Sequence, residues 1–397
     1  MKYDFESIID RKGHDAWAID DLYDDPTPPK EGWSVIPMWV ADMSFATCPT
    51  ITEAMAERVK HPCFGYFRTS DEYWNSIIDW HTKRNGVTGL ERKHLGYENG
   101  VLGGVMAAVN ALSARGDSIL VHSPTYIGFT GCLENNGYNI VLSELKLDEN
   151  NIYRMDYEDM EKKIKENNIH VCVFCSPHNP SGRVWEKEEL EKAMAIFEKH
   201  HVYVVSDEIW SDLIRPGYKH IPTQLVSEYA RMHTIAQYAT TKTFNLAGLI
   251  GSYHIVYSKY LRDRIDKEGS LSHYNDINVF SQHALIGAYK PEGHEWVDEL
   301  NQVLASNIDT MKAFLEGYGF KMTLPQGTYL LYVDATDYCE KHHISIDDLQ
   351  KKMWDYGVST QDGRPFHGPC HIRINVAIPP ALLKEACDRL EKYVLEK

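Results

Sequence analysis

The sequence lacks long hydrophobic runs. Nowhere in its 397 residues do 18 apolar residues follow one another, so we expect no transmembrane helix. The first residues contain no apolar segment of the kind that signal peptides carry, and we therefore expect a cytoplasmic protein. Basic clusters are also missing, and the net charge of −16 is spread along the chain. This excess of negative charge argues against a nucleic-acid partner or an anionic membrane surface.

Common cofactor and metal motifs are missing as well. The glycine-containing stretch 98–112 is neither G-x-G-x-x-G after a strand nor G-x-x-x-x-G-K-[ST], and no H-E-x-x-H occurs among the 19 histidines. The eight cysteines are scattered, which fits reduced thiols. Cys172 and Cys175 have C-x-x-C spacing, but they lie in an apolar run without a second pair, so we interpret them as buried core and expect no metal.

What the sequence does contain is a regular alternation of short apolar and longer amphipathic segments. Amphipathic stretches such as 186–200 separate the apolar ones, which predicts an α/β fold with a mostly parallel sheet flanked by helices. The expected strands are 118–122, 171–175, 202–206, 234–239 and 251–256.

The C-terminal part has a different pattern. It predicts a long helix at 295–318, strands at 328–333 and 371–377, and helices at 345–356 and 380–395, which together indicate a smaller α+β domain. We expect a large α/β domain at 46–285 and a small domain formed by 1–45 together with 286–397.

Chemically informative residues follow four of the expected strands. Tyr126, Asn179, Asp207 and Lys242 each come shortly after one of them. Because ligands of parallel α/β sheets bind beyond the carboxyl ends of the strands, we expect these four side chains to converge on one site.

This combination favours pyridoxal 5′-phosphate (PLP) as the cofactor. A lysine with a lowered pKa forms a Schiff base with an aldehyde, and a carboxylate such as Asp207 holds the ring nitrogen protonated. Asn179 suits the ring hydroxyl, and Tyr126 suits stacking on the ring. The start of the stretch 98–112, with Thr240 and Thr241, is a candidate phosphate site, and Arg373 is a candidate clamp for an amino-acid carboxylate.

Each residue taken alone also has a plain structural interpretation. Lys242 is compatible with a surface lysine, Asp207 with a helix cap, Asn179 with a turn, and Arg373 with a charge at a domain rim. Tyr126 is compatible with core packing, and the stretch 98–112 with an ordinary packed helix. Their common position after strands is what favours a site.

The chain resembles fold-type I PLP enzymes of the aminotransferase class I/II superfamily and, within them, the MalY/PatB group of cystathionine β-lyases and C–S lyases. The resemblance covers essentially the whole length. It rests on Met38-Trp-Val-Ala-Asp-Met-Ser-Phe45, Phe64-Gly-Tyr66, Ser176-Pro-His-Asn-Pro-Ser-Gly-Arg-Val-Trp185, Ser206-Asp-Glu-Ile209, Lys242-Thr-Phe-Asn-Leu-Ala-Gly-Leu249, Gly327-Thr-Tyr-Leu330 and Arg373-Ile-Asn-Val-Ala377.

The resemblance implies a role for each matching position. Lys242 would carry the cofactor and act as the base, Asp207 would contact the pyridine nitrogen, and Tyr126 would stack on the ring. Tyr66 would reach the phosphate of a neighbouring subunit, which implies a homodimer with shared active sites. The phosphate would also contact Val101, Leu102, Thr240 and Thr241, whereas an amino-acid substrate would contact Arg373, Asn179 and Ala41.

The activity implied is β-elimination on cystathionine- or cysteine-type amino acids, which yields a thiol, pyruvate and ammonia. An aminotransferase uses the same residues and is the alternative, and a PLP-holding regulatory protein that binds another protein is a second one. The sequence departs from the group at Trp210, where histidine is common, and at Ile127, Gly103 and Thr241. These departures concern the substrate and reaction more than the cofactor.

Overall fold

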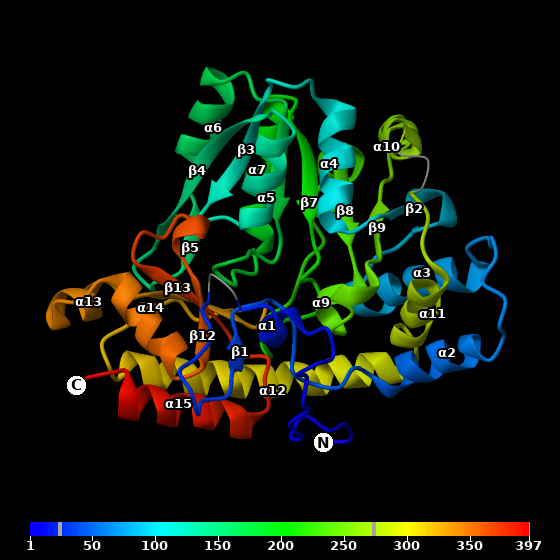
Figure 1. The fold of residues 1–397 in the computed structure, drawn as a ribbon. Helices are drawn as coiled ribbons and strands as arrows, with labels where there is room; N and C mark the ends of the chain where they lie inside the picture. Colours follow the sequence, from blue (N-terminus) through cyan, green and yellow to red (C-terminus); the bar gives the residue numbers. More distant parts are fainter. Residues whose placement is uncertain (23–25, 272–274, 397) are drawn as a thin grey trace.

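The computed structural model describes residues 1–22, 26–271 and 275–396, which form two β-sheets surrounded by helices (Figure 1). Within these residues the larger sheet has eight strands in the order β2-β9-β8-β7-β6-β3-β4-β5. Their bounds are β2 Leu95–Glu98, β3 Ser118–Ser123, β4 Asn139–Leu147, β5 Tyr153–Met155, β6 Val171–Cys175, β7 Tyr203–Asp207, β8 Thr234–Tyr238 and β9 Ser252–Ile255.

The centre of the larger sheet is parallel, as predicted. Strands β8, β7, β6, β3 and β4 pair in parallel, whereas β5 and β9 run antiparallel to their neighbours. The strand expected at 251–256 therefore exists as β9 but does not continue the parallel pattern. The chain between β8 and β9 contains only α9 (Thr240–Thr243) and the turn Ala247–Leu249, which is too little helix to carry it back along the sheet.

Helices cover both faces of the larger sheet. Val171 and Val173 of β6 pack toward α4 (Val101–Leu112), α5 (Ile127–Asn135) and α10 (Lys259–Leu271). Cys172 and Phe174 pack on the other face, toward α6 (Tyr157–Glu166), α7 (Lys187–Lys199) and α8 (Glu228–His233). Because both faces are buried, a central strand is a continuous apolar run. Cys172 and Cys175 are buried with free thiols, which confirms their assignment to the interior.

The smaller sheet contains strands from both ends of the chain. Within the described ranges its order is β1-β12-β13-β11-β10, and N-terminal β1 (Ile36–Met38) pairs in parallel with C-terminal β12 (Val358–Asp362). The remaining strands are β10 Lys321–Met322, β11 Leu330–Asp334 and β13 His371–Asn375. This pairing supports a small unit built from both termini, although the boundaries at 45/46 and 285/286 remain a prediction.

The predicted C-terminal helices are present, with shifted ends. The long helix α12 begins earlier than expected because Pro291 occupies its first turn, and it runs along the base of the molecule (Figure 1). Trp296 of α12 packs in the core beside the larger sheet, and Met311 packs in the core of the smaller sheet. The bounds are α12 Pro291–Glu316, α13 Thr336–His342, α14 Ile346–Asp355 and α15 Pro380–Tyr393.

The remaining elements lie outside the two sheets. They are α1 Trp17–Asp20, α2 Pro49–Val59, α3 Asp71–Asn85 and α11 Val279–Ala288, with 3₁₀ turns at Arg92–His94, Thr223–Leu225 and Arg364–Phe366. No helix in the described part of the chain is long and apolar enough to cross a membrane.

Candidate active site

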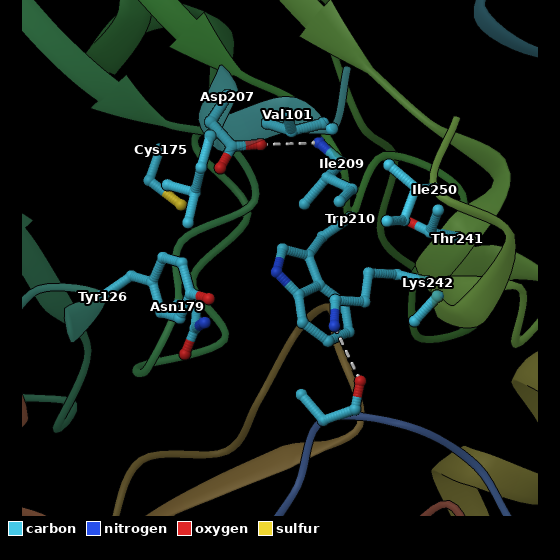
Figure 2. Close-up of a pocket in the computed structure, with 14 residues that line it drawn as sticks. Val101, Tyr126, Cys175, Asn179, Asp207, Ile209, Trp210, Thr241, Lys242 and Ile250 are labelled. Carbon is cyan, nitrogen blue, oxygen red and sulfur yellow. Dashed lines mark hydrogen bonds between the residues drawn. The ribbon is translucent and has the colours of Figure 1, made fainter. Parts of the chain in front are cut away.

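The residues that follow the parallel strands line one cavity of about 310 Å³ (Figure 2). Cys175 and Asp207 end β6 and β7, Tyr126 precedes α5 after β3, and Lys242 lies in α9 after β8. The site predicted from strand ends therefore exists as a single space. Its lining is Ala41, Gly100, Val101, Leu102, Tyr126, Cys175, Asn179, Asp207, Ile209, Trp210, Thr241, Lys242, Ala247 and Ile250.

Lys242 is held inside this cavity rather than on the surface. Its Nζ donates a hydrogen bond of 2.8 Å to the main-chain oxygen of Ala41 and lies 5.8 Å from the centre of the Trp210 ring. Burial lowers the pKa of Lys242 to about 8, and the charge of Arg373 lowers it further, against the opposing effect of Asp207. Near neutral pH a useful fraction of this lysine is therefore a neutral amine, which is the nucleophilic form.

Asp207 is buried on the opposite side of the cavity. Its side chain accepts a hydrogen bond of 3.0 Å from the main-chain N–H of Ile209. Burial raises the pKa of Asp207 to about 7, and the neighbouring Glu208 raises it further, whereas the Ile209 N–H and Lys242 lower it. A cationic N–H group bound beside Asp207 would remove this penalty, because an adjacent positive charge favours the carboxylate.

The first turn of α4 provides a site for an anion. Gly100 precedes the helix with a φ of 80°, and Gly100, Val101 and Leu102 all line the cavity. The first N–H groups of a helix have no partner within it and favour negative charge, so phosphate fits here. Thr241 lines the same cavity, whereas Thr240, also predicted for this role, lines a small neighbouring cavity instead.

Arg373 is buried rather than placed at a rim. Its side chain is 3% exposed, and its Nη1 donates to Oδ1 of Asn179 at 3.4 Å. Its Nη2 donates to the main-chain oxygen of Trp39 at 3.1 Å and to the side chain of Gln361. Burial lowers the pKa of Arg373 to about 10, so it stays charged at neutral pH. Its Nε is buried without a partner among the described residues, which leaves a donor for a ligand.

Two further side chains shape the cavity. Tyr126 makes an edge contact with Phe129, and burial raises the pKa of its hydroxyl, so it stays neutral. The indole of Trp210 projects into the space between Lys242 on one side and Tyr126 and Asn179 on the other (Figure 2). Trp210 is 2% exposed and packs edge-on against Tyr329, with ring centres 4.9 Å apart. It therefore forms a fixed wall that limits the size of a ligand.

Three predicted site residues do not line the cavity. Arg373 reaches it only through Asn179, and Thr240 faces away from it. Tyr66 is fully exposed in the single chain and lies beside a separate hollow lined by residues 64–69. Its predicted role concerns a second subunit and remains a prediction.

Sequence reasoning gave no role to some residues that contribute to the site. The Tyr329 hydroxyl donates 2.9 Å to the same Ala41 oxygen that holds Lys242, and it comes from the smaller sheet. Cys175, predicted only as core, also lines the cavity, as do Ile209 and Ala247. The motif Gly327–Leu330 pointed to the region of Tyr329, and Cys175 ends a predicted strand, but apolar and thiol side chains carry no specific signal.

The raised pKa of Asp207 predicts a pH-dependent effect of Asp207→Asn on the cofactor-free protein. The folded state, with a pKa of about 7 against an ordinary 3.8, binds the proton more tightly than the unfolded chain. Ionising this group therefore costs about 1.4 kcal/mol of stability per pH unit as the pH rises from about 4 to about 7. Asparagine avoids this cost and retains an acceptor for Ile209. Urea unfolding should show the variant gaining about 3 kcal/mol more relative to the parent at pH 8 than at pH 5.

The matched control is Asp263→Asn on α10, where an exposed aspartate pairs with exposed Lys259. Its effect should be nearly equal at the two pH values. An equally constant effect of Asp207→Asn would contradict the burial argument.

Comparison with known proteins places the chain in a family. Cystathionine beta-lyase PatB of Bacillus subtilis is 32% identical over 361 residues, which cover 90% of this chain and 92% of that protein. Protein MalY of Escherichia coli is 28% identical over 96% of both chains. The crystal structure of the PLP-bound C–S lyase from Staphylococcus hominis superposes with a TM-score of 0.87 at 30% identity, covering 98% of each chain. The family profile described as aminotransferase class I and II matches residues 34–390, and the chain belongs to this family.

Proposed function

We propose that this protein is a PLP-dependent carbon–sulfur lyase that catalyses β-elimination on cystathionine- or cysteine-type amino acids. The observation that carries the proposal is the pair of buried groups in one cavity, Lys242 with a pKa of about 8 and Asp207 with a pKa of about 7. The names of the relatives support it, because they include cystathionine beta-lyase and C–S lyase. The products would be a thiol, pyruvate and ammonia.

The residues in the cavity fit PLP. The N–H groups at the start of α4 and the Thr241 hydroxyl suit the phosphate, and the buried carboxyl of Asp207 suits a protonated ring nitrogen. Asn179 supplies an amide for the ring hydroxyl, and Tyr126 supplies a face for stacking. When bound, PLP supplies an aldehyde for the lysine amine and a ring that accepts the electrons of a broken bond at the substrate Cα.

Lys242 would act both as the anchor for the cofactor and as the base. Burial keeps part of it neutral near pH 8, so its Nζ can take the proton from the substrate Cα. The Ala41 carbonyl, which the Tyr329 hydroxyl also contacts, fixes the direction of this amine. Asp207, on the far side, would hold a proton on the ring nitrogen by remaining ionised against it.

Arg373 and Asn179 would bind the substrate carboxylate, beside Ala41. The guanidinium is buried, charged and already bonded to Asn179, so an incoming carboxylate would find a fixed partner with a free Nε donor. Anchoring the carboxylate here orients the Cα proton toward Lys242. Loss of the thiol from Cβ then leaves a three-carbon unit that hydrolyses to pyruvate and ammonia.

An aminotransferase remains the second candidate, because the matching family profile carries that description and the same residues serve both reactions. The two reactions differ in whether the Cβ–S bond breaks or the proton is returned elsewhere. Trp210, which forms the wall of the cavity, lies where it would affect this choice.

We also propose a cytoplasmic homodimer in which Tyr66 completes the cavity of the second subunit. Support comes from the exposure of three aromatic residues in one segment, because Phe64, Tyr66 and Phe67 are 53%, 105% and 40% exposed. Clusters of exposed aromatic side chains are typical of contact surfaces. The free thiols of all eight cysteines fit a reducing compartment.

Product analysis distinguishes the two activities. With L-cystathionine and no added 2-oxo acid, we expect sustained release of pyruvate and free thiol over many turnovers. A single turnover that resumes only when a 2-oxo acid is supplied would identify an aminotransferase instead. The Lys242→Ala variant is the control, because it should lose both turnover and the visible absorbance of the lysine-bound cofactor; a parent-like spectrum in that variant would contradict the anchor assignment.

Replacing Arg373 by alanine should mainly weaken substrate binding. Loss of a buried carboxylate partner costs roughly 2–4 kcal/mol, so KM should rise by about 30-fold or more while the cofactor absorbance is kept. Arg364→Ala is the matched control, because this arginine lies on the same side of the smaller sheet but pairs with Asp362 and Asp347. A parent-like KM in Arg373→Ala would remove Arg373 from the substrate site.

A further inference from the structure

Gln237 in β8 is a buried amide without a hydrogen-bond partner. Its side chain is fully buried, and both Nε2 and Oε1 lack partners among the described residues. A buried amide in this state is unfavourable, and native proteins normally satisfy it. Its neighbours therefore indicate what it is for.

Gln237 lies next to Asp207 in the larger sheet. Asp207 of β7 pairs in parallel with Gln237, and Gln237 pairs antiparallel with His254 of β9. Residues that pair directly across neighbouring strands point to the same face and lie about 5 Å apart. The three polar side chains therefore form one row, which starts at the cavity with Asp207.

The helix above this row leaves room for the amide. A Cβ atom on Gly104 of α4 would lie only 2.3 Å from Oε1 of Gln237, so any larger residue there would displace the amide. Gly104 is on the face of α4 that packs on the sheet, one turn after Val101, which lines the cavity. The amide is thus enclosed between β8 and the helix that provides the candidate phosphate site.

Asp207 has the capacity for another donor. The Ile209 N–H is the hydrogen bond recorded for its carboxyl, whereas a carboxylate with two oxygens accepts several. The charged and titratable groups around it are Glu208 on its own strand end, Lys242 of α9, and Cys175, Cys132 and Tyr126 from β6 and α5. Of these, Lys242 alone favours its ionised form.

We propose that Gln237 is a positioning residue that donates a second hydrogen bond, from Nε2, to the Asp207 carboxylate. A half-turn of the amide exchanges its nitrogen and oxygen, and a carboxylate only accepts, so Nε2 faces Asp207. This bond favours the ionised carboxylate and fixes its direction. That the carboxylate then serves a ring nitrogen rests on the proposed function, whereas the bond itself does not.

The test uses the cofactor-free protein and the variant Gln237→Met, which keeps length and volume but removes the donor. Urea unfolding is measured from pH 5 to pH 9 for each protein and for its Asp207→Asn derivative. The midpoint of the difference curve reports the pKa of Asp207. Gln237→Met should move this midpoint upward by about one to two pH units, because a hydrogen bond to a charged group has about that effect.

Gln224→Met is the matched control. Gln224 is also buried, and its Nε2 donates to the main-chain oxygens of Thr234 and Ile255, both at 2.9 Å. Its loss should lower stability but leave the midpoint unchanged. An unchanged midpoint in Gln237→Met, or an equal shift in Gln224→Met, would overturn the proposal.

Gly104→Ala provides the second variant in case Gln237→Met does not fold. It displaces the amide without changing it and should raise the midpoint in the same direction, and a parent-like midpoint there would count against the proposal. Because no cofactor or substrate is present, failure of the lyase assay would not affect the outcome, and the two proposals fail separately.

Discussion

The removal of Asp207 and Lys242 from water is the constraint on which the site depends. The two groups have opposite charges and share one cavity, but each is bonded to the main chain: Lys242 to the Ala41 oxygen and Asp207 to the Ile209 N–H. Burial therefore dominates over their mutual attraction and moves both pKa values toward neutrality. A ligand that offers a cationic N–H to one and an electrophilic carbon to the other relieves both penalties at once.

Such a site has to be supported by the rest of the fold. The central strands are buried on both faces, and the apolar core on each face is continuous with the helices that cover it. The main-chain partners of the two groups are part of this framework, so they cannot move to solvate the charges. The energy that keeps the site in its unfavourable state comes from hydrophobic burial elsewhere in the sheet.

The cavity also joins the two sheets. Its floor is the carboxyl edge of the larger sheet, whereas Ala41, Tyr329 and Arg373 come from segments on or beside the smaller one. The bond between Arg373 and Asn179 connects the candidate substrate clamp directly to the candidate cofactor contact. Substrate binding and the orientation of Lys242 therefore depend on the same boundary between the sheets, at which Trp210 packs against Tyr329.

The sequence by itself determined the central strands and the chemical groups at their ends, because a doubly covered parallel strand is a continuous apolar run and the residue after it reaches the ligand edge. It did not reveal β4, whose exposed and buried residues are mixed, or β1, which has three residues and depends on a partner more than 300 positions away. Only the tertiary structure decided that Arg373 is buried against Asn179, that Thr241 rather than Thr240 faces the cavity, and that Gln237 lies beside Asp207. Burial, distance and pKa depend on which distant segments pack together, and that packing is a property of the whole folded chain.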